Sequence, residues 1–260
     1  MPTRTAVPAG APSWIDISTS DVDATRAFYE GLFGWTSDEP DSELGGYVNF
    51  HHKGERVAGC MTAMPDTPTD VWTVYLASDD AERTCAAAVE AGGVVHAPAM
   101  QVNDLGSMAV VADPSGAPVG IWQAGTHPGL LTVGEPGFAT WFELLTRDYD
   151  ATVNFCSDVF GWAPEVVADT PEFRYTVGRV AGEEVAGVMS TGDQRPEGAT
   201  GVPTEAPAQW SVYIAVADAD ATLARAVELG GAVVYSPHES PHGQLAALTD
   251  PTGALVKVIA

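Results

Sequence analysis

Basic residues are scarce in this 260-residue chain. It has 11 Lys and Arg against 35 Asp and Glu, which gives a net charge of −24 at pH 7. A surface this acidic repels nucleic-acid phosphates and anionic lipid head groups, so we expect no nucleic acid and no membrane surface among the partners. An anionic substrate would need a local basic pocket, for which the sequence supplies only two lysines, Lys53 and Lys257, and a few arginines.

Cysteines and long apolar runs are also few. The three cysteines, Cys60, Cys85 and Cys156, form no CxxC pair, which argues against a disulfide framework or a zinc ribbon and favours a reducing cytoplasm. The N-terminus lacks the apolar core of a signal peptide, and the run 129–145 is interrupted by two glutamates and a proline. We therefore predict a cytoplasmic protein with no membrane-spanning helix.

What the chain does have is an internal repeat. Residues 14–35, WIDISTSDVDATRAFYEGLFGW, match residues 141–162, WFELLTRDYDATVNFCSDVFGW, and further blocks recur downstream in the same order. We interpret this as a duplicated domain. The expected organisation is an N-terminal domain over 1–124 that begins with a loose arm (1–12), a linker over 125–136 and a C-terminal domain over 137–260. The second copy carries an insertion over 191–208, interpreted as a surface loop and a candidate flap over a site.

A finer repeat lies inside each half. An alternating strand begins at each of four tryptophans and is followed by a helix and then by short strand-like runs separated by Gly and Pro. The first helix is expected over 21–33, with Asp21 as its N-cap, and Asp148 is the matching N-cap in the second half. The pattern predicts an α+β fold of four βαβββ modules.

These motifs resemble the vicinal oxygen chelate superfamily, which includes glyoxalase I, bleomycin-resistance proteins and extradiol dioxygenases. The carriers are Asp-(x)6-Phe, Phe-Gly-Trp and Asp-Pro-Ser/Thr-Gly-Ala, each present once per half in the same order. Among its members, the chain is most similar to the tandem-domain glyoxalase-like proteins of actinobacteria that are labelled hydroxylase and occur beside antibiotic biosynthesis. The resemblance implies two domains, each with a curved mixed sheet around a pocket.

The resemblance also implies where a metal would bind. Members take His, Gln or Glu from the first strand of a module and Glu from its last strand. The matching positions here are Trp14 and Trp141 on first strands, and Gly120 and Lys257 on last strands, with Trp72 or Thr73 and residues 210–212 as the second-module candidates. Indole, glycine and ammonium groups are poor cation ligands. We therefore predict no metal and no cofactor in either half; His238 and His242 around Glu239 are interpreted as a solvated loop.

Strand alternation places a carboxylate, Asp16 or Glu143, on the pocket side of each first strand. These two are the candidate catalytic bases, although a carboxylate that merely bonds backbone or faces water remains the alternative. The candidate ligand-binding residues combine aromatic rings with a few polar groups, as a planar ligand requires; they are Trp14, Trp72, Tyr75, Ser107, Trp141, Trp210, Tyr213 and Gln244.

The leading hypothesis is a metal-independent protein that binds a planar aromatic or polyketide-like metabolite, as an accessory or sequestering factor in secondary metabolism. The alternative is a glyoxalase-like lyase or isomerase, or an oxygenase, that uses Asp16 or Glu143 as base or a rebuilt metal site. A purely structural protein with filled pockets is the third reading. Since four modules can satisfy one another within one chain, we expect a monomer or a homodimer.

Overall fold

The computed structural model describes residues 4–65, 67–171, 173–191 and 207–260. Its elements follow the order βαβββ four times, with one short 3-10 turn at Ser42–Leu44. The N-terminal half contains β1 (Pro12–Thr19), α1 (Val22–Phe33), β2 (Thr36–Ser37), β3 (Val48–His52), β4 (Glu55–Thr62), β5 (Val71–Ala77), α2 (Ala81–Glu90), β6 (Val94–Val102), β7 (Gly106–Ala112) and β8 (Pro118–Ala124). The C-terminal half contains β9 (Ala139–Thr146), α3 (Tyr149–Phe160), β10 (Ala163–Asp169), β11 (Arg174–Val180), β12 (Glu183–Ser190), β13 (Gln209–Ala215), α4 (Ala219–Glu228), β14 (Ala232–Ser240), β15 (Gly243–Thr249) and β16 (Leu255–Ile259). The predicted modules are confirmed.

Each half forms one eight-stranded mixed sheet. The order is β2-β3-β4-β1-β5-β8-β7-β6 in the first sheet and β10-β11-β12-β9-β13-β16-β15-β14 in the second. The first strands of the two modules pair antiparallel at the centre, and each pairs in parallel with the last strand of its own module. Two modules therefore share one sheet, as the predicted fold class requires.

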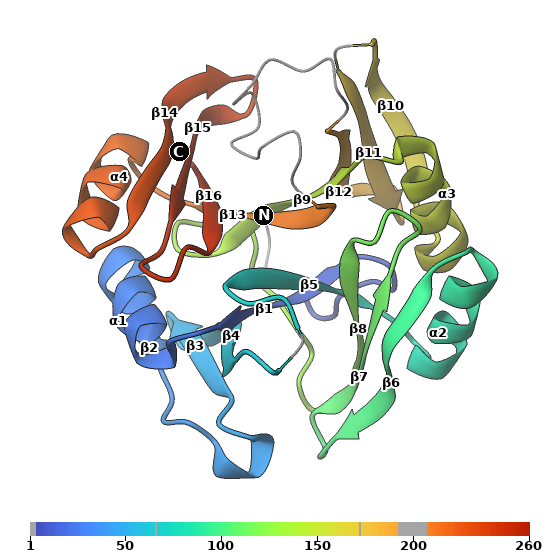
Figure 1. Cartoon of the computed structure of the whole chain (residues 1–260), viewed down its shortest axis with the longest axis horizontal. Coiled ribbons are helices and arrows are strands. Elements are labelled where there is room, and N and C mark those ends of the chain that lie inside the picture. The colour runs from blue at the N-terminus through green and yellow to red at the C-terminus, as the bar shows by residue number, and fades with distance from the viewer. Residues whose placement is uncertain (1–3, 66, 172, 192–206) are drawn as a thin grey trace.

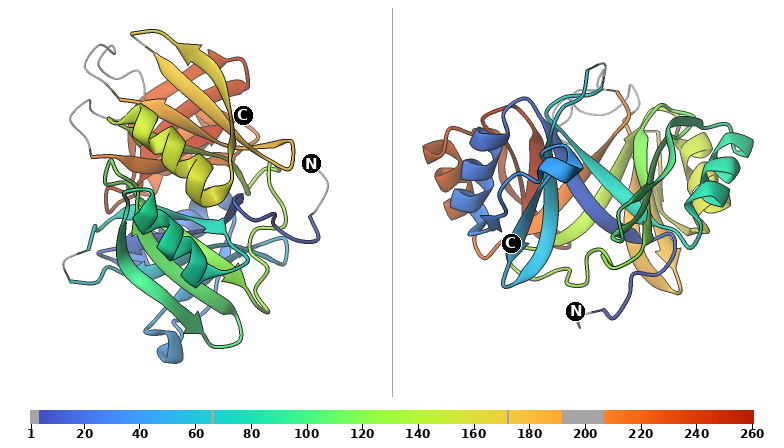
Figure 2. Two further views of the ribbon diagram at one scale, coloured as in Figure 1. Left: turned by 90° about the vertical axis from the view of Figure 1, so that its right-hand side faces the viewer. Right: turned by 90° about the horizontal axis from the view of Figure 1, so that it is seen from below.

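The two sheets curve in opposite directions (Figure 1). In that view the N-terminal sheet opens downward and the C-terminal sheet opens upward, with their central strands back to back at the waist. β5 and β13 contact each other there, and the helix pairs α1/α4 and α2/α3 flank the waist. Figure 2 shows the same pairing from the side, with α2 and α3 stacked on one flank. Within the described residues, no α-helix covers the outward, concave face of either sheet (Figure 1).

Local sequence explains the helices. Asp21 caps α1 by accepting a hydrogen bond from the Ala24 amide at 3.0 Å, which satisfies one of the free donors of the first turn. The helix ends at Gly34, whose φ of 67° is in the left-handed region that favours glycine. The prediction for Asp148 is wrong in detail, because its carboxylate makes no cap hydrogen bond; its amide instead donates to Thr146 Oγ1 at 3.0 Å.

Two kinds of repeated motif, the glycines that follow the helices and the Asp-Pro-Ser-Gly turn, contribute contacts between the two halves. A Cβ on Gly231 would lie 2.8 Å from the Phe28 ring, and one on Gly93 would lie 2.7 Å from the Phe155 ring, so these glycines admit phenylalanines from the other half. The Asp-Pro-Ser-Gly turn contributes as well, since Asp113 Oδ2 accepts a hydrogen bond from Thr152 Oγ1 at 2.6 Å. One continuous hydrophobic core therefore spans both halves.

The N-terminal arm is less loose than the sequence suggested. The Arg4 amide donates to the Leu131 carbonyl at 2.9 Å, and the Gly10 amide donates to the Ala77 carbonyl at 2.8 Å. Ala11 is fully buried before β1 begins. Residues 4–11 are therefore attached to both the linker and the sheet. Most of the predicted insertion loop, residues 192–206, lies outside the described residues.

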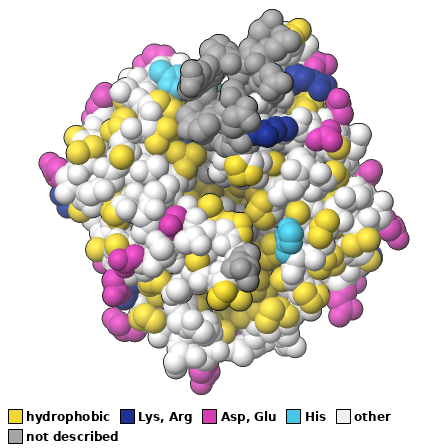
Figure 3. Space-filling view, viewed as in Figure 1, with side chains coloured by type: hydrophobic (Ala, Val, Ile, Leu, Met, Phe, Trp, Pro, Cys, Tyr) yellow, Lys and Arg dark blue, Asp and Glu magenta, His cyan; other side chains and the backbone are white. Residues whose placement is uncertain are grey.

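Acidic side chains lie mainly on the outside of the molecule. In Figure 3 they ring the outline of the visible face, whereas hydrophobic side chains gather toward its middle. Asp16 and Glu143 are exceptions, since both are buried. The negative charge is thus mostly a property of the solvated surface, and few of the carboxylates are placed for chemistry.

Candidate functional site

The central strand of each sheet divides its side chains between two faces. Ile17 pairs with Trp72 across β1 and β5, and the Trp72 ring packs 5.3 Å from Tyr29 of α1, so this face is the helix side. Because side chains alternate along a strand, Trp14 and Asp16 lie on the concave side. The predicted orientation of β1 is therefore correct, and the equivalent register places Trp141 and Glu143 on the concave side of β9.

The N-terminal concave face centres on Asp16. Its Oδ2 accepts hydrogen bonds from the Tyr75 hydroxyl at 3.0 Å and from the Tyr47 hydroxyl at 3.4 Å. Tyr47 in turn accepts a hydrogen bond from Trp14 Nε1 at 2.8 Å. Burial raises the pKa of Asp16 to about 7, against the opposing effect of the two tyrosine hydrogen bonds. At neutral pH this carboxyl group can therefore both give and take a proton.

The C-terminal concave face centres on an ion pair. Glu143 Oε2 accepts hydrogen bonds from Lys257 Nζ at 3.1 Å and from the Tyr213 hydroxyl at 2.8 Å. Lys257 also donates to the Tyr213 oxygen at 3.0 Å, and it is only 1% exposed. Trp141 Nε1 donates to the Tyr175 hydroxyl at 3.0 Å, as Trp14 does to Tyr47 in the other half. Burial and the nearby Glu143 raise the pKa of both Tyr213 and Tyr175.

The two centres differ at one strand position. In the N-terminal sheet Tyr75 pairs with Gly120, whereas in the C-terminal sheet Tyr213 pairs with Lys257. A Cβ on Gly120 would lie 2.1 Å from the Tyr75 ring. The Tyr75 ring therefore occupies the space that a side chain at position 120 would need, and a lysine cannot be accommodated there.

The same register tests whether a metal ion fits. In one half, the concave positions of three adjacent strands hold Trp14 and Asp16, then Thr73 and Tyr75, then Gly120, so a single carboxylate is the one cation ligand among them. In the other half Trp141 and Tyr213 lie beside Lys257. Indole and ammonium groups do not coordinate a cation, and the Lys257 charge opposes one. In the described part of the chain, no group of three or more His, Cys, Asp or Glu is arranged to hold a metal ion. These residues do not fit the metal site that the family resemblance implies.

The sequence analysis offered Trp72 or Thr73, with residues 210–212 as the counterparts, as second-module metal-ligand positions. Thr73 pairs with Asp16 and Ser211 pairs with Glu143, so both lie on the concave side, whereas Trp72 and Trp210 lie on the helix side. Tyr75 and Tyr213, which pair with Trp14 and Trp141, are the next concave residues of the same strands.

Four of the predicted ligand-binding residues lie on the helix side. Trp72 packs against Tyr29, and Trp210 pairs with Leu144 on the corresponding face of β13. Ser107 pairs with Gln123, whose side chain accepts a hydrogen bond from the first amide of α2. By strand alternation Gln244 shares its face with the fully buried Ala246. The predicted inward orientation of both final hairpins is therefore wrong by one residue. The four residues on the helix side are Trp72, Ser107, Trp210 and Gln244.

The sequence analysis missed Tyr47 and Tyr175. Tyr47 directly precedes β3, and Tyr175 lies on β11, the matching strand of the other half. Each hydroxyl accepts a hydrogen bond from a tryptophan of the concave face and so orients it. A signal for them existed in two glycines: a Cβ on Gly59 or on Gly187 would overlap the hydroxyl of the tyrosine beside it. A repeated glycine within an apolar strand marks such a close approach.

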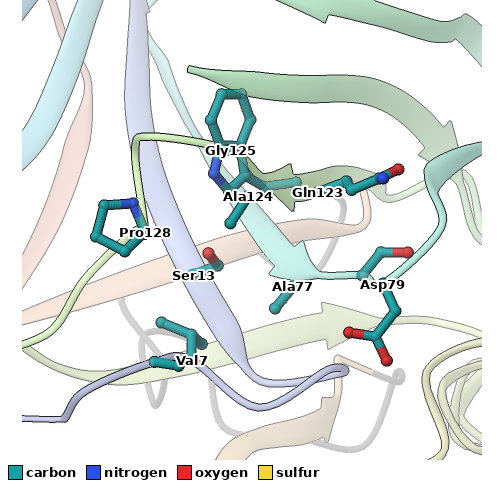
Figure 4. Close-up of a pocket in the computed structure, with 11 residues that line it drawn as sticks. Val7, Ser13, Ala77, Asp79, Gln123, Ala124, Gly125 and Pro128 are labelled. Carbon is teal, nitrogen blue, oxygen red and sulfur yellow. The ribbon is translucent and has the colours of Figure 1, made fainter. Parts of the chain in front are cut away.

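A cleft of about 400 Å³ lies elsewhere, between the N-terminal arm, the ends of β5 and β8 and the start of the linker (Figure 4). None of the predicted site residues lines it. The Trp122 ring at its wall packs 5.5 Å from His127, which packs 4.4 Å from Trp14. Burial lowers the pKa of His127 to about 4, so this ring is neutral and acts as packing between the cleft and the concave face.

Paired βαβββ modules that share a curved sheet, twice in one chain, define a tandem protein of the glyoxalase type. The chain belongs to the Glyoxalase/Bleomycin resistance protein/Dioxygenase superfamily. Residues 139–258 match the model of that family, and residues 14–121 match a related glyoxalase-like domain.

Relatives of full length support this assignment. The chain is 37% identical to CFP32 of Mycobacterium tuberculosis, a protein provisionally named as a glyoxylase, over 100% of this chain and 98% of that protein. It is 39% identical to the anthracycline biosynthesis protein DnrV of Streptomyces peucetius, over 96% of this chain and 93% of the relative. In structure it is similar to the Mn(II)-bound glyoxalase of Novosphingobium aromaticivorans, with a TM-score of 0.67 at 15% identity over 96% of this chain and 82% of the other. That likeness shows the fold alone.

Among the described helices, none combines the length and the apolar character that a bilayer crossing requires.

Proposed function

We propose that the protein binds a small, planar organic metabolite on its concave faces without a metal ion, as an accessory or sequestering factor in secondary metabolism. The observation that carries this proposal is the set of residues at the metal-ligand positions of the fold. They are aromatic side chains with a glycine or a lysine, in register on three adjacent strands. Such a set offers stacking area and hydrogen bonds rather than coordination.

The ligand class follows from the side chains that remain partly accessible. On the C-terminal face, Trp141 and Tyr175 are partly exposed near the buried Glu143. On the N-terminal face, Tyr47 is partly exposed beside the buried Asp16. Flat rings that surround one or two polar groups suit a polycyclic aromatic or polyketide-like compound. The similarity to DnrV, whose name assigns it to anthracycline biosynthesis, supports the same class.

A direct test is a tryptophan fluorescence titration of the purified full-length protein with a panel of planar aromatic compounds, with and without a chelator. We expect at least one compound to bind equally well in both conditions. Absence of quenching across the panel would contradict the proposal and favour a structural role, whereas binding that the chelator abolishes would restore the metal-dependent reading.

The second candidate function is proton transfer, as in a lyase or isomerase. The specific observation in its favour is the buried Asp16 carboxyl, whose pKa of about 7 suits a general acid or base at neutral pH. Asp16→Asn keeps the shape and removes the titration. If an activity is found, we expect the variant to lose it by about 10² to 10⁴-fold; unchanged turnover would remove Asp16 from the mechanism. Glu143→Gln, made separately, applies the same test to the other half.

The setting that we propose is the cytoplasm, with the protein as a monomer or a homodimer. All three cysteines are free and buried, as expected in a reducing compartment. Burial raises the pKa of Cys60 to about 12, so its thiol is not a reactive nucleophile.

A further inference from the structure

The geometry points to Lys257 as the group that selects the ligand of the C-terminal concave face. We propose that its ammonium group binds a carbonyl or other uncharged acceptor oxygen of a planar ligand, at the place where relatives hold a metal ion. This inference rests on the proposed function, because it requires that a ligand occupies the concave face.

The position of Lys257 carries the first step. It lies on β16 opposite Tyr213, which lies opposite Trp141 on β9. It is the side chain on this face that brings a fixed positive charge within 3.1 Å of Glu143. A buried ion pair of this kind costs several kcal/mol of desolvation per ion and is seldom the most stabilising choice for a site. A functional reason for retaining it is therefore expected.

The hydrogen-bonding capacity of the ammonium group carries the second step. Lys257 has three N–H donors, and Glu143 and Tyr213 account for two of them. Its Nζ also lies 4.9 Å from the centre of the Tyr213 ring. Since Lys257 is only 1% exposed, a ligand whose rings stack along this wall would bring its acceptor oxygen to the same nitrogen by displacing the side chains that cover it.

The charge balance fixes the kind of oxygen. Glu143 and Lys257 together carry no net charge, and the Glu143 carboxylate repels a second anion at this separation. A ligand carboxylate or phosphate is therefore disfavoured. A neutral acceptor, such as a ketone or quinone oxygen, gains a hydrogen bond from a cation without that repulsion.

The surroundings suit a flat, apolar body attached to that oxygen. Leu145 and Met189 form a small apolar cluster apart from the main core, with Tyr175 and Leu255 packed against it. Leu145 lies on the same side of β9 as Glu143 by alternation. The site thus combines an apolar floor, aromatic walls and one cationic donor. The N-terminal face cannot offer the same donor, because the Tyr75 ring fills the space at Gly120.

The test compares two planar probes that differ by one carbonyl group, 9-fluorenone and fluorene, in titrations of the full-length protein. We expect fluorenone to bind at least about tenfold more tightly, the effect of one hydrogen bond from a charged donor. The carbonyl stretching band of bound fluorenone should also shift to lower wavenumber. Both effects should disappear in Lys257→Met. Since that change strands Glu143, the double variant Lys257→Met with Glu143→Gln is measured as well, and Lys53→Met serves as the surface control.

Each outcome decides between the alternatives. A carbonyl preference that is lost in the double variant and kept in Lys53→Met supports the proposal. A preference that persists in the folded double variant overturns it, while ligand binding itself stands. A preference that responds to Asp16→Asn and not to Lys257 places the ligand on the N-terminal face and also overturns it. Binding of neither probe contradicts both this inference and the proposed ligand class.

Discussion

The two concave faces belong to duplicated halves of the chain, yet each stabilises its buried carboxylate in a different way. In both, a first-strand carboxylate lies beside a tryptophan–tyrosine hydrogen bond and accepts from a second tyrosine. In the N-terminal face the partners of Asp16 within the described residues are the hydroxyls of Tyr75 and Tyr47, and burial raises its pKa to about 7. In the C-terminal face Lys257 neutralises Glu143. One buried carboxylate is thus left titratable, whereas the other is held as an ion pair.

This difference suits the two carboxyl groups to different roles. A carboxyl group that changes its protonation near neutral pH is suited to exchange protons with a ligand. A carboxylate locked to a lysine is suited to fix the position of a donor. The duplicated chain therefore carries two unequal concave faces, and the difference originates at one strand position, Gly120 in one half and Lys257 in the other.

The largest expected effect is that of breaking the ion pair. Lys257→Met should lower the free energy of unfolding by about 3–5 kcal/mol, because Glu143 is then a buried charge without its partner. Adding Glu143→Gln should restore most of the loss. Urea denaturation of both variants measures this, and a single variant within about 1 kcal/mol of wild type would show that the pair is not buried as described.

The second effect concerns the pH dependence of stability that Asp16 gives to the N-terminal half. Because burial raises the folded-state pKa of Asp16 from its ordinary value of 3.8 to about 7, its contribution to stability is fully present below pH 4 and is lost as pH rises toward 7. At 1.36 kcal/mol per pKa unit, the loss is at most on the order of 4 kcal/mol.

Asp16→Asn should therefore be more stable than wild type at pH 8 and similar to it at pH 4. Unfolding midpoints at both pH values measure this, with Asp23→Asn on the exposed face of α1 as the control. Equal pH profiles for wild type and Asp16→Asn would contradict the assignment of a raised pKa to this group.

The third effect tests why only one half can hold a lysine. Gly120→Ala should cost about 1–3 kcal/mol through overpacking against the Tyr75 ring. Combined with Tyr75→Leu, the cost should be smaller than the sum of the two single changes. Additive costs in a double-mutant cycle would show that the ring does not restrict this position.

The smallest expected effect compares the two faces of one sheet. Trp14→Phe should weaken binding of a planar probe by about 2–10-fold, the worth of one aromatic contact. Trp72→Phe should leave binding within about twofold of wild type, since Trp72 packs against Tyr29 on the helix side. Equal losses in a fluorescence titration would mean that the ligand does not distinguish the faces.

Much of the fold was accessible from the sequence, because the duplication made each weak signal count twice. The βαβββ order, the N-cap at Asp21 and the orientation of Trp14 and Asp16 follow from periodicity and local chemistry. The facing of the last hairpins did not follow. A shift of one residue moves every side chain of a strand to the other face, and the short apolar run around Ser107 does not define its parity.

The partners of the two carboxylates could not be predicted either. The hydrogen bond from Tyr47 joins residues 31 positions apart, and the ion pair of Lys257 joins residues 114 positions apart. The family resemblance implied that Lys257 occupies the place of a metal-binding glutamate, but it did not indicate that Lys257 contacts Glu143. Register across three strands decides that contact, and register is a property of the assembled sheet.

Neither concave face offers a set of ligands for a metal ion, and the metal content of the purified protein is the measurement that checks this. The full chain would be expressed in medium supplemented with Mn, Fe, Ni and Zn, purified without chelator and measured by elemental analysis. The residues at Trp14, Tyr75 and Gly120, and at Trp141, Tyr213 and Lys257, predict a content far below one ion per chain. A stoichiometric amount of any of these metals would contradict the account.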